Sequence, residues 1–361
     1  MKNKKGERYM FSFFKKSAAK SHDAEINGKR IEVQPKETLL HAALREGLDF
    51  PHSCRVGGCA SCKCRLVSGT VKELTDIGYI LSDEELDRGY ILACQAVPQS
   101  DVKIDVDLRA QNKRKTLKGR VVLQEKLTHD ITHLKIQLGE MLSYRAGQFA
   151  DLSLDSLPGV SRSYSFATPS QPDACVSFFI RGVPGGVFSS EVNNEDLIGR
   201  DMTVSGPSGD FWLRTSEAPM VLIAGGSGLA PILAILQDSL AEGCRRPATL
   251  LFGAQTQSDL YALDQIQAIK DQWPVSFEFF PVLSREDDAS SWQGARGNVT
   301  DVIPKLNLIG SEAYLCGPPA MIDAAESLLI AGGIDRKCMH ADRFTTAADA
   351  AKADASAELV N

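Results

Sequence analysis

Four cysteines in the first third of the chain constrain its fold more than any other feature of the sequence. Cys54, Cys59 and Cys62 form a C-x4-C-x2-C run, and Cys94 follows at a distance. Thiolates in this spacing, with a distant fourth cysteine, are typical of a plant-type two-iron, two-sulfur cluster. The run contains two adjacent glycines, which let backbone N–H groups turn towards the cluster sulfides. The sequence therefore predicts that these four cysteines ligate a [2Fe-2S] cluster.

Other uses of these cysteines fit the pattern less well. A zinc site would pair two short CxxC knuckles or add histidines at fixed spacing, and neither pattern occurs. The chain has nine cysteines, an odd number, and a signal peptide is not expected from its first residues, so a disulfide framework is not expected either. These features favour the reducing cytoplasm. Cys64, on a strand predicted from Lys63 to Val67, is expected to be a packed neighbour of the cluster.

Length and charge exclude several classes of protein. The 361 residues predict two to three domains. A net charge of −6 gives no basic footprint for nucleic acid, and no apolar run is long enough to span a bilayer. Residues 1–20 are the exception, because seven Lys or Arg face only Glu7 there. This segment resembles one that makes weak peripheral membrane or partner contacts. A disordered tail, or a start at Met10, is the alternative.

Periodicity divides the rest of the chain into three patterns. Residues 24–108 predict one small α+β domain, which begins with a hairpin around Asn27-Gly28 and contains a short helix over 37–47. Short alternating strands from Gly119 to Arg214 predict an antiparallel barrel. From Met220 onward, apolar strands alternate with helical stretches, as βαβ units require.

A second motif, Arg162-Ser163-Tyr164-Ser165, lies on a predicted barrel strand. Alternate residues of a strand share a face, so Arg162 and Tyr164 present a cation and an aromatic plane together. Some twenty residues later, Gly185-Gly186 opens a predicted helix whose free N–H groups suit a pyrophosphate. The combination predicts a flavin-nucleotide site.

A third motif follows the apolar strand that ends at Ala224. Gly225-Gly226-Ser227-Gly228 leads into a helix that contains Pro231 in its first turn, where proline loses no hydrogen bond. Strand, glycine turn and helix N-terminus form a site for a dinucleotide pyrophosphate. Later, Cys316-Gly317-Pro318-Pro319 ends another strand, at the carboxyl edge where open α/β sheets bind ligands.

In this order, the motifs RxYS, GGxxS, GGxGxxP and CGPP resemble the ferredoxin–NADP reductase superfamily. With the ferredoxin pattern in front, residues 24 to 345 resemble the single-chain reductase components of bacterial ring-hydroxylating dioxygenases and multicomponent monooxygenases. The resemblance implies a multidomain fold with an α+β β-grasp ferredoxin domain, an antiparallel β-barrel flavin domain and an α/β doubly wound NAD domain. The division it implies is a basic extension (1–23), the ferredoxin domain (24–108), a linker (109–118), the FAD domain (119–215), the NAD domain (216–345) and a disordered tail (346–361).

The resemblance also implies roles for individual residues. Arg162 would pair with the flavin phosphates, Tyr164 would stack on the isoalloxazine ring and Ser165 would hydrogen-bond near flavin N5. Cys316 would position the nicotinamide, and Phe344 would cover the flavin face opposite Tyr164. The remaining cofactor contacts would come from Gly185, Gly186, Ser189, Gly225, Gly226, Gly228, Pro231, Gly317 and Pro318.

The implied cofactors are FAD rather than FMN and a nicotinamide dinucleotide. No cation stands in the stretch Phe252 to Gln257, where a 2′-phosphate would be recognised, and this favours NADH. Ser284-Arg285 resembles the pair that NADPH-specific relatives use, so NADPH stays open.

The implied function is electron transfer from NADH, through FAD and the cluster, to the terminal oxygenase or an intermediate ferredoxin of an aromatic or hydrocarbon oxygenase. No 2-His-1-carboxylate iron site is expected, so oxygen chemistry is assigned to the partner. An acidic surface comprising Asp83, Glu84, Glu85 and Asp87 would steer docking, with a solvated helix face as the alternative. Two other functions stay open: the same reductase serving a non-oxygenase partner such as a deoxysugar dehydratase, and a non-enzymatic iron–sulfur redox sensor.

Overall fold

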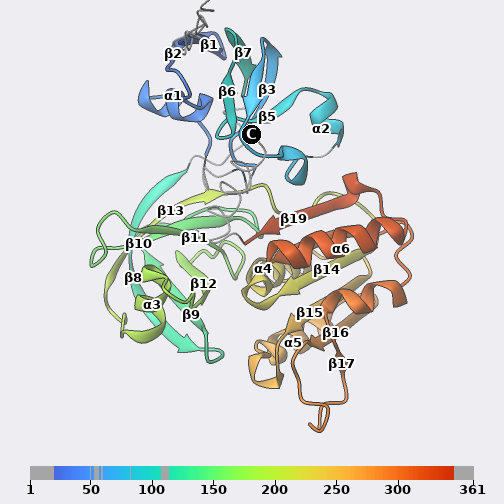
Figure 1. Ribbon diagram of the computed structural model, residues 1–361. Coiled ribbons are helices and arrows are strands. Elements are labelled where there is room, and N and C mark those ends of the chain that lie inside the picture. The colour runs from blue at the N-terminus through green and yellow to red at the C-terminus, as the bar shows by residue number, and fades with distance from the viewer. Residues whose placement is uncertain are drawn as a thin grey trace, which may run out of the picture.

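The computed structural model describes residues 20–48, 50–52, 57, 60–81, 83–106 and 114–344. Cys54 and Cys59 lie outside the described residues, as do most of the basic extension, residues 107–113 of the linker region and the C-terminal tail. The described chain forms three larger sheets, which follow one another along the sequence. Figure 1 shows the N-terminal part above the other two, which lie side by side below it.

The N-terminal part is a five-stranded mixed sheet with a helix packed against it. The strand order is β2-β1-β7-β3-β5, in which only β1 and β7 are parallel. Helix α1 is capped by the Thr38 side chain, which accepts a hydrogen bond from His41 N, and it buries Leu39 and Leu40. The elements are β1 (His22–Ile26), β2 (Lys29–Val33), α1 (Leu39–Arg45), β3 (Lys63–Ser68), β4 (Val71–Glu73), η1 (Ile77–Tyr79), α2 (Asp83–Asp87), β5 (Tyr90–Leu92), β6 (Ala96–Pro98) and β7 (Val102–Asp105).

The middle part is a six-stranded antiparallel sheet that closes on itself. Its order is β11-β10-β13-β8-β9-β12. The two edge strands meet through a bridge between Phe166 and Phe178, and Ala167 N donates to Ser177 O at 2.8 Å. The antiparallel barrel expected from the sequence is therefore confirmed. The elements are β8 (Lys115–Lys126), β9 (Ile131–Leu138), β10 (Phe149–Leu154), β11 (Ser161–Ser165), β12 (Cys175–Arg181), α3 (Val187–Asn194) and β13 (Asp201–Ser208).

Strand β8 begins earlier than the sequence indicates. Residues 115–118, expected in the linker, pair with β13 from Lys118 opposite Thr203 to Lys115 opposite Gly206. Three of these four side chains are exposed, so the segment lacks the apolar alternation by which a strand is recognised.

The C-terminal part is a six-stranded sheet in which every pair is parallel, in the order β17-β16-β15-β14-β18-β19. Helices cover both faces, as the two apolar clusters on either side of the sheet show. The doubly wound fold is confirmed, and the strand order reverses between β14 and β18. The elements are β14 (Met220–Gly225), η2 (Gly226–Gly228), α4 (Leu229–Ala241), β15 (Ala248–Ala254), η3 (Gln257–Asp259), α5 (Leu263–Gln272), β16 (Phe277–Leu283), β17 (Ala295–Arg296), η4 (Val299–Lys305), β18 (Glu312–Gly317), α6 (Pro319–Ala331), η5 (Arg336–Cys338) and β19 (Met339–Arg343).

Polar contacts tie the N-terminal part to the barrel. Arg114, just before β8, donates from Nη1 to His52 O at 3.0 Å and forms an ion pair with Asp151 on β10. His52 lies two residues before Cys54, where the run of predicted cluster ligands (residues 54–62, the cluster loop) begins. Arg114 therefore connects the segment that leads into the cluster loop to the barrel. None of the described helices is both long and apolar enough to cross a membrane.

Candidate functional site: three cofactor positions around one junction

The structure describes two of the four predicted cluster ligands. Cys62 precedes β3, Cys94 follows β5, and the backbone joins them because Ala93 N donates to Cys62 O at 3.0 Å. Both side chains are buried. The amide Nε2 of Gln95 donates to Cys94 Sγ at 3.6 Å. Hydrogen bonds to ligand sulfur are a usual feature of iron–sulfur sites, so the surroundings of Cys94 fit a cluster thiolate.

Two nearby observations bear on this site. A Cβ placed on Gly57, inside the cysteine run, would lie 2.8 Å from Gln95 Cγ, so this part of the loop packs closely on the Gln95 side chain. Cys64 is 1% exposed and stands opposite Ile91 inside the N-terminal core. Across the described ranges, no group of three or more His, Cys, Asp or Glu side chains is arranged to hold a metal ion.

The predicted flavin contacts lie on β11. Arg162 is exposed, and its Nη1 donates to Ser161 O at 2.7 Å. The Tyr164 ring lies 5.6 Å from the Phe188 ring, and burial raises the pKa of Tyr164. An exposed guanidinium and a largely buried ring two residues away fit a ligand that has phosphates at one end and a flat ring at the other.

The turn into α3 supplies backbone donors. Gly186 is the N-cap residue, no side chain caps the helix, and Gly185 has φ +74°. Ser189, which was predicted to hold the pyrophosphate, is buried; its Oγ accepts from Val183 N at 3.0 Å and donates to Gly186 O at 3.3 Å. This hydroxyl therefore stabilises the turn, and the uncapped amides at the start of α3 are the donors that suit a pyrophosphate.

Three side chains from distant segments meet where the barrel and the parallel sheet adjoin. Ser165 Oγ on β11 donates to Asp342 Oδ2 on β19 at 3.3 Å. Cys316 Sγ on β18 lies 4.0 Å from the same oxygen. Burial raises the pKa of Cys316, with a further contribution from the Asp342 charge, so its sulfur is held as a neutral thiol. Two of the three predicted catalytic residues are thus brought together with a carboxyl group.

The pKa of the Asp342 carboxyl is raised above its usual range. Burial raises its pKa to about 6, and the hydrogen bond from Ser165 offsets only part of this effect. A carboxyl that titrates near neutral pH can hold or release a proton within reach of the Ser165 hydroxyl.

Asp342→Asn is expected to change how stability depends on pH. Because the folded pKa is raised, the contribution of Asp342 to stability is full below the ordinary pKa and is lost as pH rises through 6. Between about pH 4.5 and about pH 7.5, the free energy of unfolding of the wild type should therefore fall by about 2 kcal/mol relative to that of the variant. Urea unfolding of both proteins at the two pH values measures this change, and an identical change in both would contradict it.

The dinucleotide crevice lies where the order of the parallel sheet reverses. A Cβ on Gly228 would lie 2.2 Å from Cys316 O, and a Cβ on Gly225 would lie 2.6 Å from Met321 Sδ. The glycine turn from the end of β14 through η2 therefore lies too close to the end of β18 and the start of α6 to carry side chains. Ligands of doubly wound sheets bind at this switch point, outside the carboxyl ends of the strands.

Other predicted residues frame this crevice. The structure places Pro231 in the first turn of α4 and Pro318 at the N-cap of α6. Gly226 has φ +54°, and its carbonyl accepts a hydrogen bond of 2.9 Å from Tyr261 Oη. Gly317 O accepts from Phe344 N at 2.9 Å, which attaches the segment after β19 to the end of β18.

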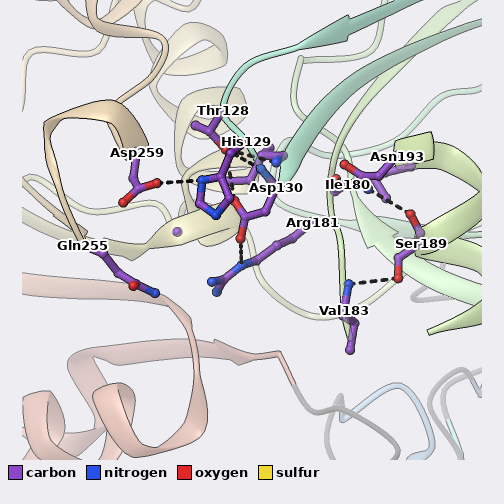
Figure 2. A network of polar contacts seen from close by, with 12 residues as sticks. Thr128, His129, Asp130, Ile180, Arg181, Val183, Ser189, Asn193, Gln255 and Asp259 are labelled. Carbon is purple, nitrogen blue, oxygen red and sulfur yellow. Dashed lines mark hydrogen bonds and ion pairs between the residues drawn. The ribbon is translucent and has the colours of Figure 1, made fainter. Parts of the chain in front are cut away.

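A polar network links the barrel to the dinucleotide crevice, and Figure 2 shows it. Asp130 accepts a 2.7 Å hydrogen bond from Arg181 Nε. The Arg181 Nη1 would lie 3.6 Å from a Cβ on Gly226, so the guanidinium stands beside the glycine turn. His129 Nδ1 lies 3.1 Å from Asp259 Oδ1 on η3. Arg181 is therefore a candidate contact for the dinucleotide phosphates that the sequence analysis did not assign.

Asp342 and Gln95 were also missed as site residues. Each is next to a motif that was recognised, since Asp342 lies two residues before Phe344 and Gln95 follows Cys94 directly. Adjacency to a motif was the only signal available. The partner of Asp342 is 177 residues away, and the sequence does not show that the Gln95 amide turns back to Cys94.

A cavity of about 360 Å³ lies at the junction of the three parts. The N-terminal part contributes Ala60, the barrel contributes Phe149 and Gly209, and the parallel sheet contributes His340 and Asp342. Ala60 is next to Cys59, and Asp342 binds Ser165. The predicted cluster loop therefore lines the same cavity as Asp342, the partner of the predicted flavin contact Ser165.

Comparison with protein families gives one match for each part. Residues 24–99 match the 2Fe-2S iron-sulfur cluster binding domain, residues 118–212 match the oxidoreductase FAD-binding domain and residues 222–327 match the oxidoreductase NAD-binding domain. The chain thus contains binding domains for all three cofactors that the sequence motifs indicated.

Similar proteins share this organisation over nearly their whole length. The xylene/toluene monooxygenase electron transfer component XylA of Pseudomonas putida is 42% identical over 321 residues, covering 88% of this chain and 91% of that protein. The phenol 2-monooxygenase reductase component DmpP of Pseudomonas sp. (strain CF600) is 35% identical over 340 residues, covering 91% and 95%.

A solved structure agrees with these relatives. The cytochrome P450 reductase GcoB of Amycolatopsis is 32% identical, with a TM-score of 0.71 over 90% of this chain and 99% of that one. The protein belongs to the family of iron–sulfur flavoprotein reductases that serve as electron-transfer components of multicomponent oxygenases.

Proposed function

We propose that this reductase carries electrons from NADH, through FAD and a [2Fe-2S] cluster, to the oxygenase component of a monooxygenase that acts on aromatic hydrocarbons. The meeting of Ser165, Asp342 and Cys316, beside the cavity that the cluster loop also lines, is the observation that carries this proposal. FAD supplies the chemistry when bound, because it accepts a hydride and passes electrons on singly. Names of relatives support the partner: one belongs to a xylene/toluene monooxygenase and another to a phenol 2-monooxygenase.

The proposed roles of the chain's own residues combine the sequence motifs with the positions of the described side chains. Cys54, Cys59, Cys62 and Cys94 would hold the cluster. Arg162 and Tyr164 would bind the flavin phosphates and ring. Ser165 and Asp342 would hold a proton near the reacting position of the flavin, while Cys316 and Phe344 would shape the nicotinamide side. The remaining glycines and prolines of the two nucleotide motifs would hold the pyrophosphate groups.

Fewer residues of the predicted acidic surface remain in the proposal as docking residues. Glu85 Oε1 lies 2.6 Å from Lys63 Nζ, so this carboxylate is engaged in an ion pair inside the protein. Asp87 is exposed, and the side chains of Asp83 and Glu84 lie outside the described residues. Among the described residues of this surface, Asp87 would therefore be the one that attracts a basic partner. We further propose a cytoplasmic location, because the cluster thiolates need a reducing compartment.

A carboxylate near the expected adenosine ribose supports NADH over NADPH. Glu286 accepts hydrogen bonds from Gln257 N at 2.8 Å and from Gln257 Nε2 at 2.6 Å. These bonds lower the pKa of Glu286 and keep it charged. The Ser284 hydroxyl donates a hydrogen bond to Ala254 O, and Arg285 Nη1 donates one to Gln255 Oε1. A 2′-phosphate at this loop would meet the Glu286 charge.

Glu286→Gln is expected to improve the use of NADPH. Removing the negative charge should lower KM for NADPH about tenfold and change KM for NADH less than about threefold. Steady-state cytochrome c reduction with each nucleotide measures the ratio. Asp287→Asn, which removes a neighbouring charge, is the control. An unchanged ratio in Glu286→Gln would show that this carboxylate does not select the cofactor.

An anaerobic titration tests the proposed function as a whole. NADH should bleach both flavin and iron–sulfur absorbance, with about three electrons taken up per chain, and cytochrome c should then be reduced catalytically. A flavin band that bleaches while the cluster stays oxidised would contradict the proposed path. Partner identity is tested separately, by comparing electron delivery to a purified hydrocarbon monooxygenase with delivery to a dehydratase.

A further inference from the structure

The cluster loop makes a buried hydrogen bond with the barrel. Gly209 N, directly after β13, donates to Ser61 Oγ at 3.3 Å. Ser61 is 5% exposed and is the residue before Cys62. A buried amide that lost its acceptor would be costly, so this bond fixes the separation between the loop and the barrel.

Gly209 can make this contact because it has no side chain. Its φ is +97°, and a Cβ there would lie 2.8 Å from two ring carbons of Phe149. Phe149 stands opposite Ser165 in the pairing of β10 with β11. The contact therefore joins Ser61, which precedes the predicted ligand Cys62, to Gly209, which packs on Phe149 beside the predicted flavin contact Ser165.

An ion-pair chain lies beside this hydrogen bond. Lys63 Nζ is 2.6 Å from Glu85 Oε1 and 3.4 Å from Asp210 Oδ2. Asp210 Oδ1 is in turn 3.4 Å from Arg214 Nη2, in the segment between β13 and β14. The Lys63 and Asp210 side chains are only partly exposed, and a partly buried pair of this kind is screened less by salt than a surface pair.

We propose that Ser61 and Lys63 are positioning residues for electron transfer within the chain. Their contacts with Gly209 and Asp210 hold the ferredoxin domain on the barrel, so that the cluster loop stays at the cavity that Asp342, the partner of Ser165, also lines. No bond is made or broken at either residue. The inference rests on the proposed function, because it concerns the passage of single electrons from the flavin site to the cluster.

Asp210→Asn and Lys63→Met test this docking contact in the holoprotein. Each removes one charge of the pair and keeps most of the side-chain volume. Hydrogen–deuterium exchange of the Gly209 amide should become about tenfold faster in both, because the bond to Ser61 opens more often. In anaerobic rapid mixing with NADH, reduction of the cluster should slow about tenfold, while bleaching of the flavin keeps its rate within about twofold. Asp210 lies outside the cluster domain, so its variant tests the contact even where Lys63→Met impairs cluster insertion.

Lys118→Met is the matched control. It removes an ion pair of 2.7 Å between Lys118 and Asp155 on the exposed face of the same barrel, and it should change neither measurement. Unchanged exchange and unchanged cluster reduction in both test variants would overturn the inference, and so would an equal slowing of flavin and cluster. Failure of the proposed function would look different, since the wild type itself would then lack the flavin band or leave the cluster oxidised.

Discussion

Cys94→Ser is expected to abolish the iron–sulfur absorbance and to lower NADH-driven reduction of cytochrome c by about 100-fold. A serine hydroxyl does not replace a cluster thiolate, and Cys94 lies in a buried position with the Gln95 amide directed at its sulfur. Bleaching of the flavin by NADH should continue, because that step needs only the barrel and the parallel sheet. Visible spectra and stopped-flow traces of the purified variant measure both effects.

Cys64→Ala is the control for this experiment. Cys64 is buried on the neighbouring strand β3, and its loss should cost about 1 kcal/mol of stability while the cluster remains. A cluster that survives in Cys94→Ser, or one that disappears in Cys64→Ala, would mean that the fourth ligand has been assigned to the wrong cysteine.

Gly228→Ala is expected to lower the rate of flavin reduction by NADH by about 100-fold. The added Cβ would lie 2.2 Å from Cys316 O, 2.6 Å from Cys316 C and 3.0 Å from Gly317 N. Backbone atoms cannot move aside as a flexible side chain can, so η2 must move away from the end of β18. The dinucleotide crevice and Cys316 would shift together, and hydride transfer tolerates little misplacement.

Two measurements separate this effect from a general loss of structure. Dithionite should still reduce the flavin and cluster of Gly228→Ala, because chemical reduction does not need the crevice. Gly139→Ala is the matched control, since no heavy atom lies within 4 Å of its Cβ position. Wild-type kinetics with NADH in Gly228→Ala would show that the close approach of η2 and β18 is not needed for the reaction.

Local sequence patterns predicted much of the secondary structure. Asn27 and Gly28 both have positive φ, at 48° and 87°, as the hairpin signal requires. Pro231 lies in the first turn of α4, where its missing N–H costs nothing. These predictions succeeded because each depends on the covalent geometry of a few adjacent residues.

Segments whose conformation depends on distant pairing were predicted less well. Strand β19 was not predicted as a strand, because all five of its residues are partly exposed and its single neighbour, β18, lies more than twenty residues earlier. Glu85 was predicted on an acidic helix face, either a docking surface or a solvated one, and it lies 2.6 Å from Lys63. Lys63 is 22 positions earlier, and a partner so far away leaves no trace in the local pattern.

The sequence by itself determined the three cofactor-binding patterns and the order of the parts, because thiolate spacing and glycine turns are local requirements of the cofactors. The class of reaction came from the resemblance that these motifs carry. Only the tertiary structure decided which residues meet between those parts. It brought Ser165 to Asp342, and Ser61 to Gly209, across separations of 177 and 148 residues. Such contacts arise from the packing of whole sheets against one another, and no pattern of neighbouring residues encodes them.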